Sequence, residues 1–437
     1  MAGCVKTMLG IGPSVAIVGA GPAGATLACL LRQRGLAVYL FNDPVRRPLL
    51  VGESLVSAAT PILRKIGVES SVAAISHIKL GAGFRHADGT RVDFRFPHYS
   101  EHRPGYAYNI PRPQFDDILL QRARALGAHV IQHRAGVGRS ASHQREIQLT
   151  AESLRHAGLA EHEHPDWLID ASGRARVFSR CLQLPADKGL RNDVAHFAHF
   201  RQFDSESAFA GQVLLTAAEH GWFWQIPLPQ GLSVGAVMNK QAWSRYGRAP
   251  QEQLDNALNA HPLLARAGAQ REAISDVASY ARYQLISRQA FGRGWVLLGD
   301  AFGFVDPMLS PGVYMALESA NQLDKVVFSR QTIKPQQLQR YCENLRQWHR
   351  AWQSLIEYFY NGKLLTMAAV RQDMLAQSRW WQPGRLMESL VSRALAGMTT
   401  GYKVQSKTCN KLFTYSCDHI CKNLTEVAHR QIARLPR

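Results

Sequence analysis

Three glycines near the N-terminus have the spacing that brings a backbone close to a dinucleotide. They follow the apolar run of residues 14–18 and open a second apolar stretch that ends at Gly35. The first glycine permits a tight turn, the second lets the chain approach a pyrophosphate, and the third lets a helix pack on a strand. Unpaired N–H groups at the helix start would face the phosphates. We therefore expect a dinucleotide site formed by Gly19, Ala20, Gly21, Pro22, Ala23 and Gly24.

The next apolar run, residues 37–41, predicts a second parallel strand. In a dinucleotide-binding unit an acidic side chain at the end of this strand binds the ribose. This chain has Asn42 at that point, followed by Asp43. Either side chain could accept a hydrogen bond from a ribose hydroxyl, so both are candidates.

Three later segments also combine a strand with a turn. Arg112 starts a predicted helix after a strand, residues 167–174 contain an Asp-Ala-Ser-Gly turn, and Asp300 ends a strand that precedes a helix near Gly312. Together with the glycine motif, these ordered segments resemble the superfamily of FAD-dependent monooxygenases and halogenases, over roughly residues 14–330. The resemblance implies that FAD is held by Arg112, Asp300, Pro307, Gly312 and Val313, with the positive end of the last helix toward the flavin.

Further segments resemble the halogenase branch of this superfamily. Gly52-Glu53-Ser54 is similar to the segment that lies over the flavin, and residues 222–227 read Trp-Phe-Trp-Gln-Ile-Pro, which fits the halogenase signature Trp-x-Trp-x-Ile-Pro. Residues 76–84 resemble the segment that carries the catalytic lysine. The resemblance implies that Ser54 contacts the flavin and that the catalytic set contains Lys79, Glu53, Trp222 and Trp224.

One turn, formed by residues 306–312, departs from the halogenase pattern. In halogenases, adjacent backbone N–H groups of this turn hold the halide, whereas this chain has Pro311, which carries no N–H, at one of those positions. A hydrogen bond to a charged acceptor contributes about 1.5–3 kcal/mol, so the loss of one donor weakens halide binding by about tenfold or more. The tryptophan-specific halogenases also have a catalytic glutamate where this chain has Leu309.

The turn therefore favours hydroxylation of an electron-rich aromatic ring through a flavin hydroperoxide. Since the chain is similar in character to the flavin monooxygenases of tryptophylquinone cofactor biogenesis, a tryptophan side chain in a protein or peptide is the expected substrate. A halogenase of a phenol, pyrrole or indole is the first alternative, and a prenyl reductase of the geranylgeranyl type is the second. A third is a flavin-containing docking protein without catalysis. The reaction requires O2, with electrons from NAD(P)H directly or from a separate flavin reductase.

The net positive charge of the chain is unusually large. Its 437 residues carry a net charge of +18, and residues 331–437 hold +10 of it, from 16 basic and 6 acidic side chains. Such an excess favours acidic partners. No RNA-binding motif accompanies it and no apolar run is long enough to span a membrane, so we expect an acidic protein or peptide substrate, with no nucleic acid and no membrane span. The seven scattered cysteines favour the cytoplasm, and the cluster Cys409, Cys417 and Cys421 matches no zinc spacing, so no metal site is expected.

These patterns predict an α/β protein. We expect a Rossmann-like FAD-binding domain of the aromatic-hydroxylase type, a mixed-sheet substrate domain and a helical C-terminal appendage in which Leu338, Tyr341, Cys342 and Leu345 form an apolar face. The expected FAD-binding domain comprises residues 1–75, 100–190 and 285–330. Residues 76–99 and 191–284 form the expected substrate-domain sheet, and residues 331–437 the basic helical region.

Overall fold

The computed structural model describes most of the first 360 residues and a short part of the C-terminal region. The predicted helical continuation around Trp380, Trp381 and Leu386 lies outside the described residues. The described residues are 13–45, 49–86, 89, 91–141, 145–189, 191–281, 284–329, 332–360, 397–406, 408–411 and 414–415.

The first large sheet is the predicted dinucleotide-binding sheet. It has six strands in the order β19-β20-β10-β1-β2-β7, and all neighbours pair in parallel except β19 and β20. β1 and β2 are buried along their whole length, as strands covered on both faces must be. The strands are β1 (Val15–Val18), β2 (Val38–Phe41), β7 (His129–Ile131), β10 (Trp167–Asp170), β19 (Phe291–Gly292) and β20 (Trp295–Leu297).

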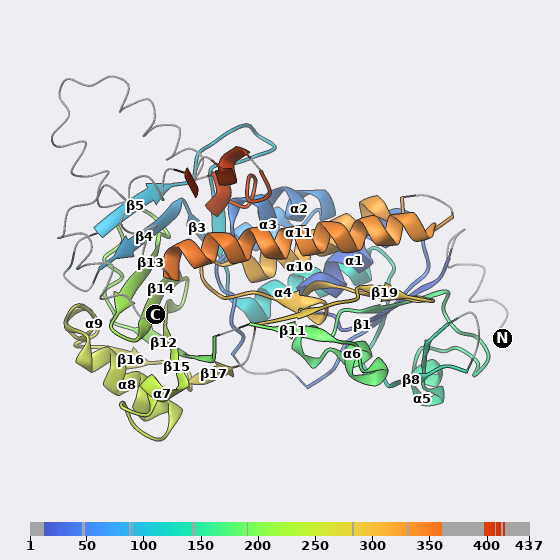
Figure 1. Ribbon diagram of the computed structural model, residues 1–437, viewed down its shortest axis with the longest axis horizontal. Coiled ribbons are helices and arrows are strands. Elements are labelled where there is room, and N and C mark those ends of the chain that lie inside the picture. Colours follow the sequence, from blue (N-terminus) through green and yellow to red (C-terminus); the bar gives the residue numbers. More distant parts are fainter. Residues whose placement is uncertain are drawn as a thin grey trace.

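Helices α1 (Pro22–Gln33), α4 (Arg112–Ala125) and α10 (Pro311–Val326) form a layer on one face of this sheet, with α1 packed against both of the others (Figure 1). Each begins with proline in its first turn, where a missing N–H costs nothing. α1 ends before Gly35, whose φ of +81° stops the helix where the sequence predicts.

A second large sheet is mostly antiparallel. Its order is β16-β12-β15-β14-β13-β4-β5, with β17 also paired to β12, and β13 and β4 are parallel. One face packs on α8 (Pro250–Ala260) and α9 (Pro262–Ala267) through Phe200, Phe223 and their neighbours. The strands are β4 (Gly81–Arg85), β5 (Arg91–Arg95), β12 (Asp193–Arg201), β13 (Val213–Ala218), β14 (Gly221–Leu228), β15 (Gly231–Asn239), β16 (Glu272–Ala273) and β17 (Ala278–Ala281).

Short sheets and short helices accompany the two large sheets. One pair is formed by β3 (His77–Lys79) and β6 (Ala107–Asn109), and another by β8 (Val137–Arg139) and β9 (Ile147–Leu149). Three strands, β11 (Ala186–Lys188), β18 (Leu285–Ser287) and β21 (Gly303–Phe304), form a small sheet. The remaining helices are α2 (Thr60–Ile66), α3 (Glu69–Ala74), α5 (Ala151–His156), α6 (Val177–Leu182) and α7 (Lys240–Trp243).

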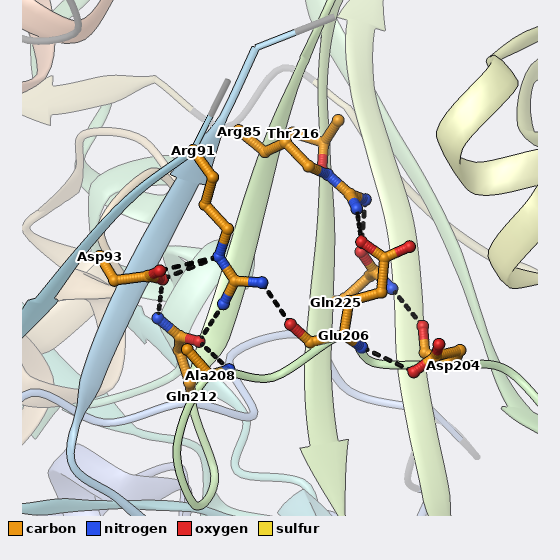
Figure 2. A network of polar contacts seen from close by, with 9 residues as sticks. All are labelled: Arg85, Arg91, Asp93, Asp204, Glu206, Ala208, Gln212, Thr216 and Gln225. Carbon is orange, nitrogen blue, oxygen red and sulfur yellow. Dashed lines mark hydrogen bonds and ion pairs between the residues drawn. The ribbon is translucent and has the colours of Figure 1, made fainter. Parts of the chain in front are cut away.

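A polar network braces one face of the second sheet (Figure 2). Since side chains alternate along a strand, Arg85 of β4 and Gln225 of β14 lie on this face, whereas Phe84 and Trp224 lie on the other. The buried guanidinium of Arg85 bonds to Glu206 and, at 3.2 Å, to Gln225. The loop between β12 and β13 is thereby tied to four adjacent strands, through Arg85, Arg91, Asp93, Asp204, Glu206, Ala208, Gln212, Thr216 and Gln225.

The long helix α11 (Pro335–Tyr360) reaches from one large sheet to the other (Figure 1). Its 26 residues span roughly 39 Å. The Tyr341 hydroxyl donates to the carbonyl of Leu297 in β20 at 3.0 Å, and Phe359 packs on Phe84 of β4 with ring centroids 5.6 Å apart. At the last residue, the Tyr360 hydroxyl accepts from Trp222 Nε1 at 3.0 Å and donates to the buried Asp306 carboxylate at 3.2 Å.

The α/β prediction is confirmed: a mainly parallel sheet, a second mixed sheet and a following helix are all present. The predicted apolar face of α11 is buried, and Trp348 and Trp352 belong to the same core. These two tryptophans therefore stabilise the fold and are not exposed for stacking on bases.

Replacing Tyr360 by phenylalanine tests this junction. Trp222 loses its acceptor and Asp306 loses a donor, so we expect Tyr360→Phe to lower the free energy of unfolding by about 1–3 kcal/mol in urea titrations. Tyr358→Phe is the matched control, since Tyr358 donates to Thr414 at 2.8 Å and contacts neither residue. Equal losses of unfolding free energy in the two variants would show that the contacts of Tyr360 with Trp222 and Asp306 stabilise the fold no more than the Tyr358 hydrogen bond does.

Candidate active site

A cavity of about 1170 Å³ lies between the two large sheets. One wall comes from the β1–α1 turn, the end of β10 and the start of α10, and the other comes from β4, β13 and β14. Of the residues predicted for the site, all except Gly24 line this cavity: Gly19, Ala20, Gly21, Pro22, Ala23, Asn42, Asp43, Glu53, Ser54, Lys79, Arg112, Trp222, Trp224, Asp300, Pro307, Gly312 and Val313.

The glycine turn has the shape that a pyrophosphate requires. A Cβ atom on Gly21 would meet no atom within 4 Å, so this position faces open space in the cavity. A Cβ atom on Gly24 would lie 1.9 Å from the carbonyl oxygen of Gly19. Gly24 thus serves the packing of helix on strand, as expected, and does not line the cavity.

Both ribose candidates lie at the end of β2. Asn42 donates from Nδ2 to Gln132 Oε1 at 2.8 Å, and the Asp43 carboxylate lies 3.8 Å from the guanidinium of Arg134. Both side chains line the cavity, so both stay candidates for a hydrogen bond with a ribose hydroxyl.

Charged groups occupy the middle of the cavity. Arg112 forms a two-bonded ion pair with Asp116 at 3.1 and 3.2 Å, and bonds to the carbonyl of Val51. Burial raises the pKa of Asp300 to about 6, against the opposing effect of Arg112 and Arg174. An open glycine turn, cationic side chains and the start of α10 fit the diphosphate, ribityl and ring parts of FAD.

Lys79 is buried, 3% exposed, at the inner end of the cavity. Its Nζ donates to Ser54 Oγ at 2.8 Å and to the carbonyl of Leu55 at 3.0 Å. Protonated lysine has three N–H bonds, so one remains for a molecule in the cavity. Burial lowers the pKa of Lys79 to about 7, which makes both protonation states accessible at neutral pH.

Glu53 faces a partner that the sequence did not reveal. Its Oε1 lies 2.6 Å from His199 Nε2 in β12, and Glu53 is only 2% exposed. The pairing fixes the carboxylate at the cavity wall. His199 therefore orients the Glu53 carboxylate. Ser54, which is expected to contact the flavin, also accepts a hydrogen bond from Lys79 and so orients that side chain.

Trp222 and Trp224 form an aromatic wall beside Lys79, with ring centroids 5.8 Å apart. Their indole N–H groups donate away to Tyr360 and Ser233 and leave ring surface toward the cavity. The part of the cavity lining that β4, β5, β13 and β14 supply is mostly apolar. Among the described lining residues of β3, β4, β5, β13, β14 and the segment after β5, Lys79 is the only charged side chain; the others are Ala82, Phe94, Phe96, Val213, Leu215, Trp222, Trp224 and Ile226.

The turn before α10 has an uncommon backbone. Leu309 and Ser310 both have positive φ, 64° and 59°, in the left-handed region. The N–H of Ser310 donates to the carbonyl of Pro307 at 3.1 Å, and Pro311 has no N–H. Of residues 310–312, only Gly312 has an N–H that is not used within the turn. Gly312 lies in the first turn of α10.

Several lining residues were not predicted. Arg174 and Arg176 follow the Asp-Ala-Ser-Gly turn and could have been inferred from it, whereas Tyr280 and Thr399 carry no motif. Thr399 shows that part of the C-terminal region reaches the cavity. Cys417, Cys421 and most of the predicted basic docking region lie outside the described residues.

Residues 97–368 match the family model of the tryptophan halogenases. The chain belongs to the tryptophan halogenase family. It is 30% identical over 335 residues to the 1H-pyrrole-2-carbonyl-[peptidyl-carrier protein] chlorinase of Pseudomonas fluorescens, covering 70% of this chain and 73% of that protein. It is 29% identical over 316 residues to the tryptophan 2-halogenase of Chondromyces crocatus, covering 70% and 59%.

Solved structures agree with this assignment. The myxobacterial chondrochloren halogenase matches with a TM-score of 0.68 and 26% identity, covering 80% of this chain and 82% of that one. A flavoprotein/dehydrogenase from Cytophaga hutchinsonii matches with a TM-score of 0.76 and 21% identity, covering 94% and 99%, and shares the fold.

Three predictions are confirmed for this member of the tryptophan halogenase family. It belongs to the superfamily of FAD-dependent monooxygenases and halogenases, it is an enzyme, and its cofactor is FAD. No helix within the described ranges is long and apolar enough to cross a membrane.

Two glycine variants separate packing from cofactor binding. Gly24→Ala places a methyl group against Gly19, so we expect the unfolding free energy to fall by about 3 kcal/mol or more. Gly21→Ala should leave unfolding of the FAD-free protein unchanged and weaken FAD binding by roughly tenfold or more, about 1.4 kcal/mol, in fluorescence titrations. Unchanged FAD affinity in Gly21→Ala would contradict the placement of the diphosphate.

Lys79 should control the pH dependence of turnover. Because burial lowers its pKa to about 7, the charged donor is lost as pH rises through that value. We expect kcat to fall between pH 6 and 8.5, a window chosen to lie about one unit or more to each side of that pKa. Lys79→Met should lower turnover by about 100-fold or more with FAD retained, while Lys240→Met, at an exposed site, should leave it unchanged. A flat profile in the unmodified enzyme would exclude this role.

Proposed function

We propose that this enzyme uses FAD and O2 to halogenate an electron-rich, uncharged aromatic ring. The observation that carries the proposal is the position of Lys79 in the same cavity as the apolar, tryptophan-containing lining that β4, β5, β13 and β14 supply. The names of its relatives support halogenation over the hydroxylation that the sequence favoured.

Reduced FAD, when bound, supplies the two electrons that activate O2. In halogenation, the aromatic ring, a halide, a proton, O2 and reduced FAD give the halogenated ring, oxidised FAD and two waters. The chain contributes the remaining functions. Lys79 would hold a proton on Nζ for the reacting oxygen or halogen, and the faces of Trp222 and Trp224 would exclude water.

The cavity also limits the substrate. A free amino acid would bring a carboxylate and an ammonium group into a space whose described walls from β3 and the second sheet offer only one charged side chain, that of Lys79. An uncharged ring, such as a phenol, a pyrrole or an indole, avoids this desolvation cost. Such a ring can be free or attached to a protein. Delivery by an acidic protein partner remains the expectation from the charge of the chain, and a separate flavin reductase is the proposed electron source.

Hydroxylation is the second candidate, and Pro311 favours it. With the Ser310 N–H bonded to Pro307 and no N–H on Pro311, two consecutive residues of this turn offer no backbone donor to a halide. In hydroxylation the ring, O2 and reduced FAD give the hydroxylated ring, oxidised FAD and one water. A protein tryptophan, as in tryptophylquinone biogenesis, is the proposed substrate for this outcome.

One assay decides between the two products. The full-length enzyme is supplied with FAD, a flavin reductase, NADH, O2, bromide and either phenol, pyrrole, indole or a tryptophan-containing peptide. Mass spectrometry distinguishes bromine incorporation from oxygen incorporation. Brominated product supports halogenation and hydroxylated product alone supports the second candidate. Oxidation of reduced FAD with O2 reduced only to hydrogen peroxide, and every probe unchanged, would contradict both.

Pro311→Ser should shift the product toward halogenation. The substitution restores one N–H, which contributes about 1.5–3 kcal/mol to binding of a charged acceptor, so the bromide concentration for half-maximal bromination should fall by about tenfold or more. Pro335→Ser is the matched control, because Pro335 also begins a helix and lies outside the cavity. An unchanged bromide requirement in Pro311→Ser would contradict the role assigned to this turn.

A further inference from the structure

A second group of potential ligand atoms lies outside the cavity. One side-chain atom from each of His133, Glu152 and His156 falls within 4.8 Å of the others. The two imidazole rings stack with centroids 3.9 Å apart and planes inclined by 16°. Glu152 and His156 are four residues apart on α5 and therefore share one face of the helix.

Backbone and hydroxyl hydrogen bonds hold the two supporting segments together. The N–H of Thr150 donates to the carbonyl of Gly136 at 3.0 Å, and the N–H of Gly136 donates to Ser153 Oγ at 2.8 Å. Thr150 also caps the start of α5 by accepting from the N–H of Ser153. The scaffold that carries the three ligands is therefore fixed, while their exposed or half-exposed side chains can adjust.

We propose that His133, Glu152 and His156 bind a divalent cation of the zinc class, and that this cation changes the affinity for FAD. Two imidazoles and a carboxylate are a common three-residue ligand set for Zn²⁺, which completes its tetrahedron with water. Hard cations such as Mg²⁺ prefer all-oxygen sites and do not match this set. Residue spacing does not signal this set, because the ligands come from two separate segments of the chain.

The residues on either side of His133 explain the coupling to the cofactor. Gln132 accepts a hydrogen bond from Asn42 at 2.8 Å, and Arg134 pairs with Asp43 at 3.8 Å. Asn42 and Asp43 line the cavity at the expected ribose end. A cation that holds His133 against α5 therefore restrains the segment that contacts both ribose candidates.

The first measurement is calorimetric titration of Zn²⁺ into the chelator-treated, full-length, untagged protein with FAD bound. We expect one Zn²⁺ per chain at this site, with affinity lowered at least tenfold in His133→Ala, Glu152→Gln and His156→Ala. His162→Ala is the matched control, since His162 is an exposed histidine of the same region outside the cluster. Mg²⁺ should give no comparable binding.

Zinc binding that the three variants leave unchanged, or that His162→Ala weakens equally, would overturn the site. The second measurement is the FAD dissociation constant with and without Zn²⁺. A change of about threefold or more that disappears in His156→Ala supports the coupling, while an FAD affinity independent of Zn²⁺ overturns it. Neither result depends on which aromatic product the enzyme makes, so failure here is distinguishable from failure of the proposed function.

Discussion

The burial of one ammonium group, that of Lys79, is the constraint on which the arrangement of the site depends. A buried cation without acceptors costs several kcal/mol, so the fold must bring oxygen atoms to it. β6 achieves this by pairing on one side with β3, which carries Lys79, and on the other with the segment of Ser54 and Leu55. The Gly-Glu-Ser segment is thereby fixed at the cavity, and Lys79 retains one N–H for chemistry.

The second requirement is that the two large sheets keep a fixed separation, because the cavity lies between them. α11 supplies this connection. It is anchored on β20 through Tyr341 and on β4 through Phe359, and its last described residue, Tyr360, joins Trp222 of the aromatic wall to Asp306 of the turn before α10. On the opposite face, the Arg85 network holds the strands that present this wall (Figure 2). The cavity is therefore braced from both sides of the second sheet.

The parts of the site that sequence could predict are those whose geometry is local. The Gly19–Gly24 turn, Arg112 at a helix start and Asp300 at a strand end each belong to one strand–turn–helix unit, and such units impose their own conformation. The pairings Glu53–His199 and Trp222–Tyr360 join residues more than 130 positions apart, and they depend on strand register and on where a long helix ends. The same reason applies to His133 and α5. Sequence spacing carries no information about such contacts.

Fold and family alone do not determine which product forms, because both proposed reactions would use the same cofactor, the same lysine and the same aromatic wall. They differ in whether a halide competes successfully for the reactive oxygen. That competition depends on the backbone N–H donors of the turn before α10. There the Ser310 N–H is bonded to the carbonyl of Pro307, and Pro311 has no N–H. A difference of about 1.5–3 kcal/mol corresponds to a factor of roughly 10 to 150 in halide affinity. A single proline can therefore change the reaction without any visible change in the fold.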